Sequence, residues 1–187
     1  MDNQNLPQKS EQKYELAKRE EVIRSFSPMV MLKTHRHIKT VQSVLETTSE
    51  SLSVHSNGMG EDALLALIEL HIWGLNESMN LNNKLKEMQV VEIALEIFNH
   101  YYYLKMEDIF LVFRRAKMGD YGKLYSSLSM IDIFSWFSKY DAERTELFIE
   151  KNTAHIHHDS SERNSTKDND AFQLHKVMVD YKIDTKK

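Results

Sequence analysis

The sequence predicts an all-α protein: a small helical bundle or orthogonal helical domain with a helical N-terminal arm and a polar C-terminal tail. The 187 residues include two prolines, Pro7 and Pro28, so the strongest helix breaker is absent after residue 28. Apolar residues recur at helical spacing in segments joined by short connections, and such connections make neighbouring helices fold back on each other. No segment shows the apolar and polar alternation of a β-hairpin strongly enough to compete.

The N-terminal region, residues 1–60, is predicted to be a charged helical arm and linker. After a polar start, Ser10 can cap a helix that runs to about residue 26. Pro28 separates it from a second segment, about 29–54, with rough helical spacing. The run of Ser, Asn and Gly at 56–60 marks the boundary to the next domain, because these residues punctuate periodic segments.

Residues 61–152 should form the compact domain, with helices at about 61–79, 86–102, 105–118 and 129–152. The side chains expected to face its core are Leu64, Leu67, Ile68, His71, Ile72, Leu75, Met79, Val90, Val91, Ala94, Leu95, Phe98, Tyr101 or Tyr102, Met106, Ile109, Phe110, Phe113, Ile133, Phe134, Phe137, Tyr140 and Leu147. Residues 153–187 are polar and are predicted to be a largely disordered tail with a short terminal helix near 171–181.

Composition restricts the function. The chain has no cysteine, which excludes disulfides, thiolate catalysis and sulfur-ligated metals. It has neither an apolar run typical of a signal peptide nor one long enough to span a bilayer, so we expect a cytoplasmic protein with no membrane contact. Residues 61–150 carry 9 basic and 15 acidic groups. A global attraction to nucleic acid is therefore not supported, and a phosphate site would need a local basic patch.

One such patch surrounds a turn that contains Gly119 and Gly122. Glycine adopts positive φ at a helix end without a steric penalty, so this turn is specified by the sequence. The predicted partner-binding residues around it are Arg114, Arg115, Lys117, Tyr121, Lys123 and Tyr125. Cations interleaved with aromatic rings suit single-stranded nucleic acid, but cations also stabilise a helix C-terminus and rings can fix a turn to the core. The acidic balance of the domain favours protein contact or structure.

Acidic residues and histidines give no specific catalytic or metal signature. The carboxylates near the turn are Glu107, Asp108, Asp120, Asp132, Asp141 and Glu143. Helix capping by Ser129 with Asp132, and a favourable first-turn position for Glu107 and Asp108, explain most of them. His155, His157 and His158 with Asp159 lie in a tail too polar to fold alone, which indicates adventitious metal affinity.

Further histidines and aromatic residues have ordinary structural explanations. His71 and His100 fit hydrogen-bonded core or boundary positions, and His35 and His37 a basic face. Consecutive tyrosines at 101–103 cannot all face inward, so at least one should be exposed at an interface.

The region 62–148 resembles a group of small helical proteins carried by phages and mobile elements of gut anaerobes, a group without a settled activity. The matching residues are Tyr103-Leu104, Glu107-Asp108-Ile109, Phe113, Ala116-Lys117, Gly119, Tyr121-Gly122-Lys123, Tyr125, Tyr140, Glu143 and Arg144. The chain departs from that pattern at Ser129-Met130, where the group tends to have Asp-Gly. The layout is also similar to phage helicase loaders, a likeness of fold alone.

These observations predict a non-enzymatic protein-interaction module, an accessory factor of phage or mobile-element replication similar to a helicase loader. No cofactor, metal site or catalytic residue is expected. A single-stranded nucleic-acid binder and a metal-dependent hydrolase are the alternatives. The sequence does not identify the partner or the oligomeric state, and it leaves open whether the N-terminal arm packs on the core.

Overall fold

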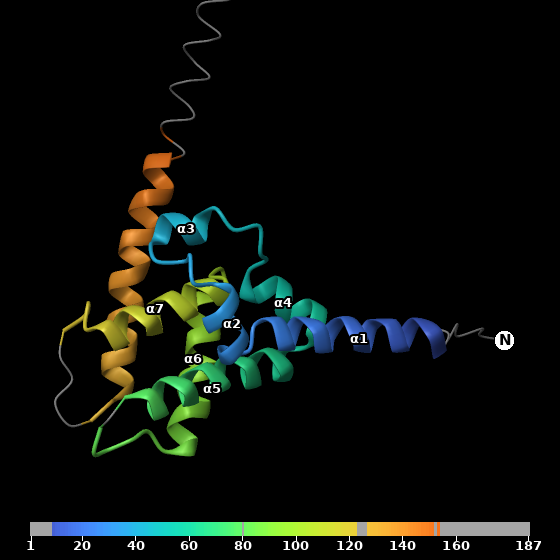
Figure 1. Cartoon of the computed structure of the whole chain (residues 1–187), viewed down its shortest axis with the longest axis horizontal. Helices are drawn as coiled ribbons and strands as arrows, with labels where there is room; N and C mark the ends of the chain where they lie inside the picture. The colour runs from blue at the N-terminus through green and yellow to red at the C-terminus, as the bar shows by residue number, and fades with distance from the viewer. Residues whose placement is uncertain (1–8, 80, 123–126, 152, 154–187) are drawn as a thin grey trace, which may run out of the picture. The chain divides into compact units, whose positions relative to one another are not determined.

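The computed structural model describes residues 9–79, 81–122, 127–151 and 153 (Figure 1). Every regular element in these residues is a helix, which confirms the all-α prediction. The elements are α1 (Lys9–Ser25), α2 (Pro28–Thr34), α3 (Val41–Leu45), α4 (Leu52–Met59), α5 (Glu61–Ser78), α6 (Glu87–Tyr101), α7 (Met106–Met118) and a final helix at 130–151. None of the described helices has both the length and the apolar composition of a membrane span.

The chain divides into two compact units, residues 1–144 and 145–187. The first unit contains α1 to α7 and the start of the final helix. Of the second unit the structure describes 145–151 and residue 153, which are helical. The predicted tail and its terminal helix near 171–181 lie outside the described residues.

The long helix α5 is the centre of the first unit. It packs most extensively against α6 and also contacts α1, α2, α4 and α7 (Figure 1). Its buried Asn76 fixes the following loop, because the amide donates to the carbonyl of Leu85 (3.1 Å) and accepts from the backbone N–H of Leu85 (2.9 Å). Gly74 of α5 faces Pro28 at the start of α2, where a Cβ at position 74 would make an ordinary van der Waals contact of 3.8 Å with the proline ring.

The predicted start and stop signals are confirmed at the helices that follow α5. Gly119 has φ of 86° and ends α7 in the left-handed conformation, as expected for a glycine after a helix. The final helix begins with the predicted capping box: the Ser129 N–H donates to Asp132 Oδ2 (3.0 Å), and the Asp132 N–H donates to Ser129 Oγ (3.3 Å). These local signals therefore set the helix boundaries.

In the N-terminal region residues 28–60 pack into the core, a point that the sequence left open, and they form three short helices where one helical segment was expected. The second segment is divided into α2, α3 and α4, and its fully buried side chains are Met31, Ile38, Val41, Val44 and Leu52. The expected linker at 56–60 is mostly the end of α4. Tertiary contacts explain the difference: the N–H groups of Leu52 and Ser53 donate to the carbonyls of Leu104 and Tyr102. Local propensity is readily overridden by such packing.

Candidate functional site

The two predicted arginines of the basic turn have internal partners. Arg114 Nη1 donates to the backbone carbonyls of Arg36 (3.2 Å) and Ile38 (2.9 Å), which ties α7 to the loop between α2 and α3. Arg115 forms a bidentate ion pair with Glu143, with distances of 2.5 and 3.1 Å. The hydrogen bonds to Glu143 and the negative charge of that carboxylate raise the pKa of Arg115. Both guanidinium groups therefore hold helices together.

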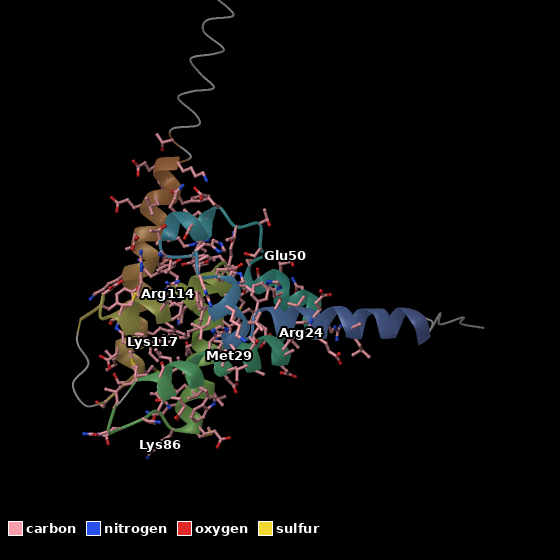
Figure 2. All side chains as sticks on the ribbon, viewed as in Figure 1. Arg24, Met29, Glu50, Lys86, Arg114 and Lys117 are labelled. Carbon is pink, nitrogen blue, oxygen red and sulfur yellow. The ribbon has the colours of Figure 1, made fainter. Side chains whose placement is uncertain are left out.

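The other predicted contact residues have different environments. The Tyr121 ring stacks on Trp136, with centroids 6.0 Å apart, and its hydroxyl is buried. Lys117 is exposed on α7, near Arg114 (Figure 2). Lys123 and Tyr125 lie outside the described residues. Among the four predicted residues that the structure describes, Lys117 is the one with an exposed side chain, and partner binding by the set stays a prediction.

A buried polar network lies between the start of α7 and the final helix. Asp108 is fully buried, and its Oδ1 accepts a hydrogen bond from the Tyr140 hydroxyl (2.5 Å) and lies 3.3 Å from Arg144 Nε. Burial raises the pKa of Asp108, whereas Tyr140 and Arg144 act in the opposite direction. Asp108 Oδ2 accepts from the Lys105 N–H (2.7 Å) at the start of α7. The network fixes the final helix to α7 and leaves Asp108 inaccessible to a substrate.

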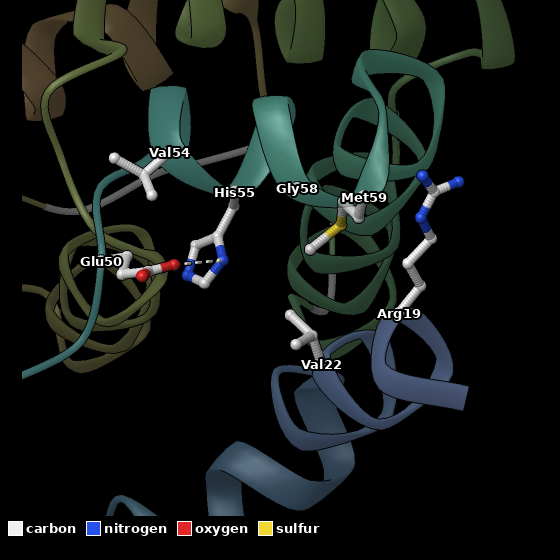
Figure 3. A pocket seen from close by; sticks show the side chains of 7 residues that line it. All are labelled: Arg19, Val22, Glu50, Val54, His55, Gly58 and Met59. Carbon is white, nitrogen blue, oxygen red and sulfur yellow. Dashed lines mark ion pairs between the residues drawn. The ribbon is translucent and has the colours of Figure 1, made fainter. Parts of the chain in front are cut away.

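A small pocket of about 100 Å³ surrounds His55 (Figure 3). Arg19 and Val22 of α1 lie on one side, and Glu50 with residues of α4 on the other. Burial lowers the pKa of His55, with Glu50 at 3.9 Å opposing the change, so the imidazole is neutral near pH 7. This pocket is smaller than the roughly 300–1,000 Å³ typical of small-molecule sites.

A larger, open pocket of about 510 Å³ lies between the loop after α2, the region of α3 and the start of α7. It is lined by His35, His37, Ser43, Glu46, Thr47, Thr48, Ser49 and Glu107. Sequence reasoning assigned His35 and His37 to a helix face and Glu107 to a first-turn position, and it did not bring them together. No three His, Asp or Glu side chains among the described residues are arranged to hold a metal ion. His155, His157 and His158 lie outside the described residues.

The exposed side of α6 carries a second apolar stripe, which we call the α6 outer face: Met88, Val91, Leu95, Phe98 and Tyr102. Met88 is 77% exposed, Val91 41%, Leu95 39% and Tyr102 54%, while Phe98 is half-buried. The prediction that Val91 and Leu95 point into the core is wrong. The core side of α6 is formed by Val90, Ile93, Ala94 and Ile97. The helix α6 therefore has two adjacent apolar stripes, one buried and one exposed, which the sequence analysis treated as one.

Comparison of the chain with protein-family models, curated proteins and solved structures finds no match. The resemblance to proteins of phages and mobile elements therefore stays a prediction. The function has to be argued from the geometry.

Proposed function

We propose that this chain is a non-enzymatic protein-interaction module whose α6 outer face binds a basic amphipathic helix of a partner protein. The observation that carries the proposal is the exposed, regularly spaced apolar stripe on α6. Single exposed apolar residues are common on protein surfaces, but a contiguous set on one helix face is typical of an interaction site.

The spacing of the stripe indicates a helical partner. Met88, Val91, Leu95, Phe98 and Tyr102 follow one another at intervals of three, four, three and four residues. This alternation is the heptad pattern of a helix that packs along another helix. Because α5 already covers the opposite side of α6, the stripe is available for a helix from outside the described fold.

The charges beside the stripe indicate that the partner helix is basic. Glu87 and Glu92 occupy the flanking heptad positions, and the sequence has no Lys or Arg between Lys86 and Lys105. Flanking positions select partners through ion pairs, so a helix with Lys or Arg there would be favoured. Two copies of α6 in contact would instead bring carboxylates together, which argues against self-association through this face.

The single-stranded nucleic-acid alternative has less support from the geometry. Arg114 and Arg115 already donate to internal acceptors, and Tyr121 stacks on Trp136. A phosphate or base would have to replace these contacts. The role of accessory factor in phage or mobile-element replication is compatible with a helix-binding module and stays a prediction.

Two designed helical peptides with the same leucine stripe test the proposal, one with Lys and one with Glu at the flanking positions. We expect the full-length chain to bind the Lys peptide and not the Glu peptide. Val91→Asp combined with Leu95→Asp should weaken binding at least about tenfold, because two apolar contacts are lost. The affinity is measured by fluorescence anisotropy.

Leu70→Asp is the matched control, because Leu70 is an exposed apolar residue on α5 outside the stripe. It should bind like the parent. Equal binding of both peptides, or binding unaffected by the double substitution, would refute the proposal. Sedimentation velocity completes the test: a dimer of the parent chain that the double variant abolishes would identify a second copy, and not a partner, as the occupant.

A further inference from the structure

The larger pocket contains a buried carboxylate oxygen without a hydrogen-bond donor. Glu107 lines the pocket and is 3% exposed. Its Oε1 lies 3.8 Å from His35 Nε2, beyond hydrogen-bonding distance, and its Oε2 has no partner. Buried polar atoms are nearly always paired, and an unpaired one is destabilising. This atom is less than 1 Å² exposed, so a donor in the pocket would pair with it once the Glu107 side chain turns toward the pocket.

The lining of the pocket favours a cation. Its eight lining residues include two carboxylates, Glu46 and Glu107, and no Lys or Arg. Burial lowers the pKa of His35, an effect that outweighs the opposing influence of Glu107, so this imidazole is neutral near pH 7. Lys105 lies nearby, but its ammonium donates to the Thr47 carbonyl (2.7 Å) and hydroxyl (3.1 Å). The cations around the pocket therefore leave Glu107 Oε2 unpaired.

The size of the pocket indicates an organic cation and not a metal ion. A volume of about 510 Å³ falls in the range of roughly 300–1,000 Å³ typical of small-molecule sites. A metal ion would need several ligands converging within about 2–2.6 Å, and the described residues offer no group of three. The rings of His35 and His37 lie nearly parallel, 6.1 Å apart at 23°, and provide flat surfaces beside the carboxylate.

We propose that this pocket binds a guanidinium group, which pairs with the Glu107 carboxylate and packs against the His35 and His37 rings. A guanidinium is planar, carries N–H donors in a fork that matches a carboxylate, and stacks on flat rings. It could be supplied by an arginine side chain of a protein or by a small guanidino compound. No residue of α6 lines the pocket, so the site is independent of the α6 outer face.

The test titrates the full-length chain with methylguanidine and follows the imidazole C–H resonances by NMR. We expect the His35 and His37 signals to shift and the signal of the exposed His100 to stay constant. Glu107→Gln keeps the shape of the side chain and should weaken binding at least about tenfold, because a charge-assisted hydrogen bond is lost. Glu61→Gln, which changes an exposed carboxylate at the start of α5, is the control and should leave the affinity unchanged. If Glu107→Gln does not fold, Glu46→Gln replaces it and should weaken binding severalfold.

Two further ligands identify the source of the group. A capped Gly-Arg-Gly peptide tests an arginine side chain, and butylamine tests an ammonium. Binding of methylguanidine and the peptide supports a general guanidinium site, and binding of the peptide alone supports an arginine side chain of a protein. Shifts with butylamine alone, affinity unaffected by Glu107→Gln, or no shift with any ligand up to about 10 mM, would overturn the proposal.

Discussion

Replacement of His71 by Gln should remove a large part of the acid sensitivity of this fold. His71 is buried in α5, and its Nε2–H donates to the Phe26 carbonyl (2.7 Å). Because a carbonyl oxygen only accepts hydrogen bonds, Nε2 must carry a proton. Burial, reinforced by nearby Lys117, lowers the pKa of His71 from 6.5 to about 4, although the bond to Phe26 opposes the change. In the unfolded chain the imidazole returns to its ordinary pKa.

The sign of the effect follows from proton binding. Between about pH 6.5 and 4 the unfolded chain binds a proton at His71 that the folded chain does not, so the free energy of unfolding falls as the pH falls. One pKa unit corresponds to about 1.4 kcal/mol, so the full loss is roughly 3 kcal/mol, of which about 2 kcal/mol is reached near pH 5. At about pH 7.5 the contribution is close to zero.

Urea unfolding followed by circular dichroism measures this effect at about pH 7.5 and pH 5. The parent chain should lose about 2 kcal/mol more than His71→Gln between the two conditions. The test compares the change in the free energy of unfolding between the two pH values. The value at a single pH also reflects the different shape of the Gln side chain. Asn99→Gln, at an exposed position on α6 without a titratable side chain, should keep the pH dependence of the parent. Equal losses in the parent and His71→Gln would refute the assignment of a neutral, buried imidazole.

Two further predictions concern single contacts in the first unit. Tyr140→Phe should lower the free energy of unfolding by about 1–3 kcal/mol, because it removes a hydrogen bond to the buried Asp108, whereas Tyr102→Phe at an exposed position should change it little; urea unfolding compares the two. Gly119→Ala should cost about 1 kcal/mol because an L side chain is strained at φ of 86°, while Gly58→Ala within α4 should stabilise by up to about 1 kcal/mol. Thermal melts measure both glycine variants. Melting temperatures that shift in the same direction for Gly119→Ala and Gly58→Ala would contradict the argument from backbone conformation.

Much of the fold follows from local sequence signals. The helices α5, α6 and α7 begin and end within one or two residues of their predicted bounds. Gly119 ends α7 and the Ser129–Asp132 capping box begins the final helix, because both signals act through neighbouring backbone groups. The hydrogen-bonded core position of His71 was predicted correctly for the same reason, since helical spacing placed it among apolar neighbours.

The errors arise where distant contacts decide. Residues 28–60 contain short apolar groups with no strong period, and they fold because α5, α7 and the 102–104 segment cover them. The burial of Glu107 depends on packing against the loop after α2, which spacing along the chain cannot reveal. The two faces of α6 were merged because Val90 and Val91, like Ala94 and Leu95, are consecutive, and consecutive apolar residues do not show which one faces the core.

The arginines of the described fold explain why its surfaces should attract basic partners. All three arginines of residues 61–150 have internal partners: Arg114 donates to backbone carbonyls, Arg115 donates to Glu143, and Arg144 forms an ion pair with Asp108. This region has 15 acidic and 9 basic groups. The pairs Arg115–Glu143 and Arg144–Asp108 each remove one charge of either sign, so 13 acidic and 7 basic groups remain and the balance stays acidic. The α6 outer face is flanked by Glu87 and Glu92, and the larger pocket contains Glu46 and Glu107. The same distribution of charge therefore favours a cationic ligand at two separate places and disfavours phosphate at both.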